Sequence, residues 1–203
     1  VLPSLSEITG APLGDMSILF SVRSLGFLAG AFVVGRFYDR GAGHTFISSM
    51  LIVIAVLLSM IPFITTLWAL TAFMLMLGII GSTVDVGCNT FIVWVHREKV
   101  APYMNGLHFF FGVGGFVAPL LLAQVLLHTG RISWCFWFLS LLIVPVAIWI
   151  FFLPAPKPSK SMDSDMNLTS IPDLKLFMTV ILFLSLFVGV EISFGGWRLA
   201  VGG

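Results

Sequence analysis

Residues Gly78–His96 read GIIGSTVDVGCNTFIVWVH, an apolar run that is long enough to cross a bilayer and holds a single carboxylate. That carboxylate is Asp85, and Asn89 follows four residues later, which puts both on one helix face a turn apart. Ser82 falls on the same face and would offer a hydroxyl to a bound solute. A charge at membrane depth is costly and usually marks an ion or substrate path. The run therefore predicts a membrane-spanning helix that carries a transport site.

The composition of the whole chain also points to the membrane. Of its 203 residues, 59% are hydrophobic and only 9% are charged, whereas a soluble domain usually has about 25% charged residues. The net charge of +1 is uninformative about a nucleic-acid partner, but the lack of a basic cluster argues against one. Cys88 and Cys135 fall inside apolar runs without metal-ligand spacing, so we expect two reduced, structural thiols and no metal site.

Apolar segments of about 20 residues, the length that a bilayer requires, recur along the chain. Residues 1–8 look like the end of a helix whose start is missing, and both ends of the chain look cut, so we expect a fragment of a longer protein. Gly26 and Gly30 form a GxxxG pattern, which predicts close helix packing. Counting the partial first helix, seven spans are expected; the others lie at residues 16–38, 45–66, 67–95, 104–127, 132–153 and 174–197, with a charged loop at 96–103.

A long polar segment divides the chain into three expected parts. These are an N-terminal transmembrane bundle at residues 1–153, a linker at 154–173, and the first helix of a second bundle at 174–203. The basic residues gather in alternate loops, which the positive-inside rule assigns to the cytoplasm together with the linker. Asn167 begins an Asn-x-Thr glycosylation pattern, but on this topology it faces the cytoplasm, so we expect it to be unmodified.

The turn after the second span carries Gly35, Asp39 and Arg40 in the order Gly-x-x-x-Asp-Arg. Asp39 can accept hydrogen bonds from backbone N–H groups at the next helix start, and Arg40 can pair with a carboxylate on a neighbouring helix. The turn resembles the signature of the major facilitator superfamily, which latches the cytoplasmic gate in that family. The match departs at Ala42–His44, where a glycine and two basic residues are usual. An ordinary positively charged turn is the alternative.

Asp85 and Asn89, followed by Asn105-x-x-His108 at the opening of the next span, resemble the fucose–proton symporters and the sodium-dependent glucose transporter-like proteins. The resemblance implies an all-α, six-helix N-terminal bundle of the major facilitator type, with its first helix truncated, plus the seventh helix. It also implies that Asp85 couples a proton or a sodium ion, since burial disfavours the charged form of a carboxyl group. The alternative is a permanently protonated Asp85 that joins two helices.

Further candidates for the solute site, besides Asn89, are Asn105, His108, Arg23, Glu191 and Trp197. His108 would donate to a sugar or relay protons, or else be satisfied between helices. Arg23 would hold a carboxylate or a solute oxygen, or else extend outward to the interface. Glu191 and Trp197 belong to a Gly-x-Glu…Gly-Gly-Trp run that resembles the seventh helix of the glucose-transporter-like proteins. Trp197 would stack on a sugar ring or anchor the helix at the interface.

The sequence thus predicts a secondary active transporter of the cell membrane that moves a small polar solute, with a monosaccharide as the leading expectation. The expected coupling ion is H⁺ or Na⁺, with no other cofactor, and the expected partners are the solute, the bilayer and the rest of the same chain. An exporter of the same superfamily is one alternative, although Pro119 follows Ala118 where such exporters usually have glycine. A seven-helix receptor is the other, and the lack of a catalytic constellation argues against an enzyme.

Overall fold

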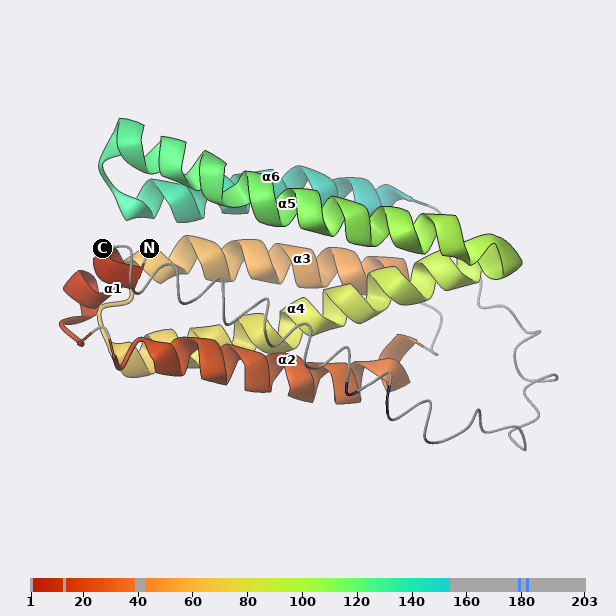
Figure 1. Ribbon diagram of the computed structural model, residues 1–203, viewed down its shortest axis with the longest axis horizontal. Helices are drawn as coiled ribbons and strands as arrows, with labels where there is room; N and C mark the ends of the chain where they lie inside the picture. Colours follow the sequence, from red (N-terminus) through yellow and green to blue (C-terminus); the bar gives the residue numbers. More distant parts are fainter. Residues whose placement is uncertain (1, 13, 39–42, 154–178, 180–181, 183–203) are drawn as a thin grey trace. The chain divides into compact units, whose positions relative to one another are not determined.

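The computed structural model describes residues 2–12, 14–38, 43–153, 179 and 182, and every regular element in this part of the chain is helical (Figure 1). One-turn 3₁₀ helices, Ile61–Phe63 and Arg97–Lys99, follow the third and fourth α-helices. The all-α fold expected from the sequence is confirmed. The α-helices are α1 (Leu2–Thr9), α2 (Ser17–Tyr38), α3 (Gly43–Met60), α4 (Leu67–His96), α5 (Val100–Thr129) and α6 (Ile132–Phe152).

Three helical stretches of the described residues are long and apolar enough to cross a membrane: Gly43–Phe63, Leu67–Thr129 and Ile132–Phe152. The second of these contains both α4 and α5, which have 30 residues each. The chain divides into two compact units, residues 1–158 and 159–203, and the six helices all belong to the first. The expected linker and seventh span lie outside the described residues, apart from Thr179 and Leu182.

The expected charged loop at 96–103 is largely helical, so that prediction was wrong. Helix α4 continues to His96, the 3₁₀ turn Arg97–Lys99 follows at once, and α5 already begins at Val100. Pro102 stands in the first turn of α5, where a proline has no intrahelical hydrogen bond to lose. The two helices are therefore joined by a connection of only three residues.

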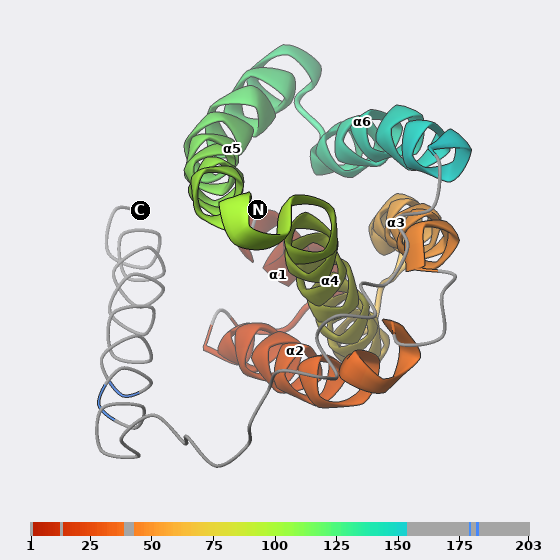
Figure 2. The same cartoon turned by 90° about the vertical axis from the view of Figure 1, so that its right-hand side faces the viewer.

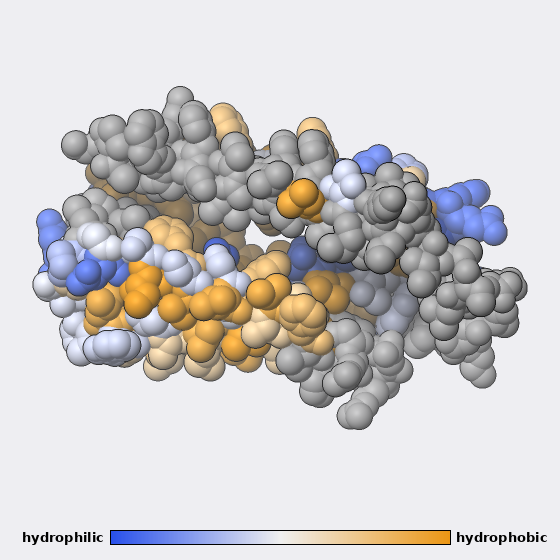
Figure 3. Space-filling model, turned by 60° about the horizontal axis from the view of Figure 1, so that its bottom comes forward, coloured by the Kyte–Doolittle hydropathy of each residue, from blue (hydrophilic) through white to orange (hydrophobic). Residues whose placement is uncertain are grey.

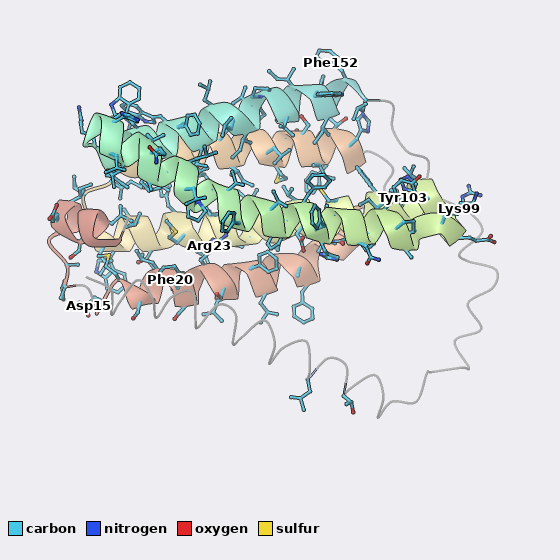
Figure 4. All side chains as sticks on the ribbon, turned by 45° about the horizontal axis from the view of Figure 1, so that its top comes forward. Asp15, Phe20, Arg23, Lys99, Tyr103 and Phe152 are labelled. Carbon is cyan, nitrogen blue, oxygen red and sulfur yellow. The ribbon has the colours of Figure 1, made fainter. Side chains whose placement is uncertain are left out.

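The chain reverses at Arg97, which has a backbone φ of 47° and is the only described non-glycine residue with positive φ. The His96 ring stacks on that of Tyr103 across the turn, with ring centroids 3.5 Å apart. Lys99 and Tyr103 lie at one end of the bundle and Asp15 lies at the other (Figure 4). The turn Arg97–Lys99, which carries two basic residues, thus lies at the opposite end of the bundle from Asp15. Its cytoplasmic location stays a prediction.

Helices α2 and α4 run parallel and pack through the glycines of the GxxxG pattern (Figure 1). A Cβ added at Gly30 would overlap the hydroxyl of Ser82 on α4. A Cβ added at Gly78 would overlap the carbonyl oxygen of Arg23 on α2, and Gly26 is similarly enclosed. The backbones of the two helices therefore touch directly, which is the purpose of small residues at membrane helix interfaces.

Helices α3 and α6 run antiparallel and are joined by serine hydroxyls. Ser48 donates to the carbonyl of Ala147 at 2.7 Å, and Ser140 donates to the carbonyl of Ala55 at 2.8 Å. The hydroxyl oxygens of Ser59 and Ser140 also lie 2.8 Å apart. These hydrogen bonds bind α3 to α6 at two levels, in apolar surroundings where water does not compete for them.

Helix α4 is the centre of the arrangement, because it packs against α2, α3 and α5 (Figure 2). Helix α5, by contrast, has no buried residue in the described part of the chain. The outward face of α2 is apolar, as the side turned forward in Figure 3 shows. Its exposed large side chains are Ile18, Phe20, Leu25, Phe27, Leu28 and Phe32. An apolar outer surface of this kind suits a lipid environment.

Candidate functional site

Asp85 and Asn89 lie one turn apart on α4 and are in contact. The side-chain amide Nδ2 of Asn89 donates to the backbone carbonyl of Asp85 at 2.8 Å, and it lies 3.5 Å from the carboxylate oxygen Oδ1. Asp85 is exposed on the surface of the described bundle, and among the described residues its second carboxylate oxygen accepts no hydrogen bond. The pair presents an anionic oxygen beside an amide, a combination that can hold a cation or a hydroxyl-bearing solute.

Ser82 does not share the open face, so the expectation that it contacts a solute was wrong. Its side chain is fully buried at 0% exposure, and its hydroxyl donates to the carbonyl of Ile79 at 2.8 Å. The cause is the glycine packing of α2 on α4, because Gly30 faces Ser82 at the point of closest approach. Periodicity along one helix cannot show that a second helix covers this position.

Asn105 and His108 lie in the first three turns of α5, and both are exposed. Because α4 and α5 are joined by one short turn, residues at equal distances from that turn lie at similar depths along the bundle. The helix rise places Asp85 about 16 Å from the end of α4 and His108 about 12 Å from the start of α5. By the same measure, Asn89 lies about 10 Å from the end of α4 and Asn105 lies about 8 Å from the start of α5. The four predicted site residues therefore occupy similar depths on neighbouring helices.

In the described part of the chain no hydrogen bond joins the α5 pair to the α4 pair. The side chains of Asn105 and His108 are exposed and so accessible to a solute. A neutral imidazole has one donor and one acceptor nitrogen, and a carboxamide has two donors and one acceptor. Together with Asp85, these groups match the donors and acceptors of a polyhydroxylated molecule.

Arg23 lies in the second turn of α2, nearer the end of the bundle that carries Asp15 (Figure 4). Its backbone is level with Gly78, and Asp85 is seven residues further along α4, about 10 Å by helix rise. The Arg23 side chain is exposed. Among the described residues it forms no ion pair with Asp85, so a role for Arg23 would have to be with a solute or at the membrane interface.

Most of the predicted gate residues and both predicted residues of the seventh helix lie outside the described part of the chain. Gly35 lies in the last turn of α2, as the gate signature requires, while Asp39, Arg40, Glu191 and Trp197 lie outside the described residues. The described residues contain no group of three side chains suited to a metal ion. Both cysteines are free thiols, as expected.

Two features were missed in the sequence. The first is the set of serine bonds between α3 and α6, whose only sequence signal is a recurrence of serine in otherwise apolar spans. The second is His44 in the first turn of α3. Its Nε2 lies 3.2 Å from the hydroxyl of Thr45, while its Nδ1 is buried and has no hydrogen-bond partner among the described residues. It follows the gate turn directly, at a position where a basic residue is usual.

Comparison with known proteins places these features in a family. The family model described as "Major Facilitator Superfamily" matches residues 1–200. The chain is 33% identical to "Sodium-dependent glucose transporter 1A" of Mus musculus over 117 residues, which is 58% of this chain and 28% of the relative. It is also 33% identical to "Sodium-dependent glucose transporter 1" of Homo sapiens over 109 residues, 54% of this chain and 21% of the relative.

A more distant relative is matched over more of the chain. "Major facilitator superfamily domain-containing protein 4A" of Danio rerio is 22% identical over 192 residues, 71% of this chain and 36% of the relative. No solved structure matches the chain. The matched part of the chain thus spans between about a fifth and a third of the curated relatives' length.

Proposed function

Because the chain belongs to the major facilitator superfamily, we propose that it is part of a symporter that carries a monosaccharide across the cell membrane together with a sodium ion or a proton. Family membership and the apolar helices make it a membrane protein of a transporter family rather than an enzyme. Transporters of this kind bind solute near the membrane midplane and expose it to each side in turn. Under the proposal the linker at 154–173 is cytoplasmic.

The observation that carries the proposal is the exposed carboxylate of Asp85, held beside the Asn89 amide inside an apolar 30-residue helix. An ionisable side chain at membrane depth is retained for a function, because it destabilises insertion by several kcal/mol. A carboxylate that is open on one side can take up a cation from one compartment and release it into the other. Asp85 is therefore assigned the ion-coupling role.

The solute assignment depends on the open polar groups at the same depth, Asn105 and His108, and on the relatives. The two mammalian relatives named above are sodium-dependent glucose transporters, at modest identity over about half of this chain. Their names support a sugar as solute and favour sodium over the proton as the driving ion. Sugar hydroxyls both donate and accept, which suits carboxamide and imidazole side chains.

The proposal is tested by uptake of radiolabelled glucose into proteoliposomes that contain the full-length protein. Vesicles are prepared with an inward sodium gradient, an inward proton gradient or neither, at equal membrane potential. Accumulation above the external concentration under one ion gradient, and equilibration without it, is the expected result. Equilibration under every gradient, for glucose and for a panel of other monosaccharides, would refute coupled sugar transport.

A further inference from the structure

We infer that Asn89 is a positioning residue for Asp85, which fixes the carboxylate for ion binding, rather than a residue that binds the sugar directly. The inference rests on the proposed function, since it assigns Asn89 a place in the coupling step. It follows from the contact between the two side chains, from what surrounds Asp85, and from the way in which neighbouring polar residues of α4 use their hydrogen bonds.

The contact has two parts. The Asn89 amide is anchored on the Asp85 backbone carbonyl at 2.8 Å, and from that anchor the same nitrogen reaches Oδ1 of the carboxylate at 3.5 Å. The short bond orients the amide, and the longer contact restrains the carboxylate rotamer on the side that faces Asn89. Among the described residues, the second carboxylate oxygen accepts no hydrogen bond.

Among the side chains that the structure describes, none forms an ion pair with this carboxylate. Arg23 is about 10 Å away along the helix axis, at the level of Gly78. Asn89 is thus a neutral donor that satisfies part of the carboxylate without neutralising its charge. An unpaired carboxylate of this kind can bind a mobile cation.

The neighbouring polar side chains of α4 behave differently. Ser82 donates to the carbonyl of Ile79 at 2.8 Å, and Thr90 donates to the carbonyl of Val86 at 2.7 Å. Both hydroxyls are thus used on the backbone of their own helix. Asn89 makes the same backbone bond and adds a contact with an ionisable side chain, which is what a larger amide can do and a hydroxyl cannot.

This difference supplies a matched pair of variants. Asn89→Ser keeps a side chain able to bond the Asp85 backbone carbonyl, as Thr90 does to Val86, but it is too short to reach the carboxylate. Thr90→Ala removes the backbone bond one residue away and leaves the Asn89–Asp85 contact intact. The first variant tests the carboxylate contact, and the second controls for loss of a helix hydrogen bond.

The experiment measures two constants for full-length wild-type protein and both variants in proteoliposomes: the half-saturating sodium concentration, and the glucose KM at saturating sodium. We expect Asn89→Ser to raise the sodium constant by about tenfold, the effect of losing a hydrogen bond to a charged group, with an unchanged glucose KM. Thr90→Ala should change neither constant. Asn89→Ala, with the same expectation, replaces the serine variant if that one is not recovered as folded protein.

Two outcomes would overturn the inference. A raised glucose KM with an unchanged sodium constant in Asn89→Ser would show direct sugar binding and overturn it. Equal changes of the half-saturating sodium concentration in Asn89→Ser and Thr90→Ala would show that the change comes from loss of a helix hydrogen bond. That result would also overturn the inference. If wild-type uptake follows a proton gradient and not the sodium gradient, the half-saturating proton concentration is compared between the wild type and the variants instead. Uptake that follows neither gradient overturns the proposed function itself.

Discussion

The carbonyl oxygen of Arg23 on α2 lies so close to the Cα of Gly78 on α4 that a Cβ at Gly78 would overlap it. The overlapping atom belongs to the backbone, which cannot rotate away as a side chain can. Gly78→Ala should therefore push the two helices apart and lower the free energy of unfolding by about 1–3 kcal/mol, the usual effect of overpacking. Thermal unfolding of the purified full-length protein in detergent measures the change.

The control for this variant lies on the same helix. A Cβ at Gly81 meets nothing within 4 Å among the described residues, so Gly81→Ala should gain up to about 1 kcal/mol from its better helix propensity. Equal destabilisation by the two alanines would contradict the glycine contact between α2 and α4.

Asp85→Asn keeps the shape of the side chain and removes its charge. We expect the variant to lose gradient-driven accumulation of sugar while it retains exchange of labelled for unlabelled sugar, because exchange requires no net movement of the ion. The measurement compares net uptake with counterflow in proteoliposomes. Asp15→Asn, at the end of the bundle, is the matched control (Figure 4). Full accumulation by Asp85→Asn would remove this residue from the coupling role.

Arg23→Gln should leave the half-saturating sodium concentration within about twofold of the wild-type value. The reason is distance, since Arg23 lies two helical turns, about 10 Å, from Asp85 along the helix axis and forms no ion pair with it among the described residues. Sodium titration of the initial uptake rate measures the constant. A tenfold change would mean that the two charges meet during the transport cycle in an arrangement different from this one.

Ser140→Ala removes the hydroxyl that donates to the Ala55 carbonyl and lies 2.8 Å from the Ser59 hydroxyl. We expect a loss of about 0.6 kcal/mol, the average for hydrogen bonds between membrane helices, in unfolding measured by denaturant titration. Ser49→Ala is the control, because its exposed hydroxyl bonds only within α3, to Thr45. An equal loss in both variants would contradict a specific α3–α6 link.

Arg97→Gly should stabilise the protein, because Arg97 has a φ of 47° and a ψ of −117°, a conformation that favours glycine. Release of this backbone strain is worth about 1 kcal/mol, measured as a rise in the unfolding midpoint. Glu98→Gly, one residue later and without positive φ, should instead destabilise. Destabilisation by both substitutions would show that the Arg97 side chain outweighs the strain of its backbone.

The helices and the Asp85–Asn89 contact could be predicted because both depend on neighbours along the chain. Apolar length defines a span, and a spacing of four residues defines a shared face. The burial of Ser82 could not be predicted, because the helix that covers it approaches at Gly30, 52 positions earlier in the sequence. The start of α5 was misplaced because the charged residues at 96–103 suggested a loop, whereas a 3₁₀ turn and the first turn of α5 accommodate them.

The serine bonds between α3 and α6 show the same limit. Nothing in the order of residues relates Ser48 to Ala147, since antiparallel packing alone brings them together. The gate signature was visible as a motif, yet its action depends on Asp39 and Arg40, which the described residues do not include. Local periodicity therefore identified the candidate ion site, while its surroundings required the arrangement of the helices.

The backbone contact between α2 and α4 also has a mechanical consequence. Side chains at an interface can change rotamer and so absorb a small displacement, but glycine Cα atoms pressed against carbonyl groups have no such compliance. We therefore expect a displacement of one helix to move the other with it. On this expectation, α2 and α4 move as one rigid body. Arg23 lies near one end of α2 and Asp85 lies beyond the middle of α4, so a tilt of the helix pair would move both residues together.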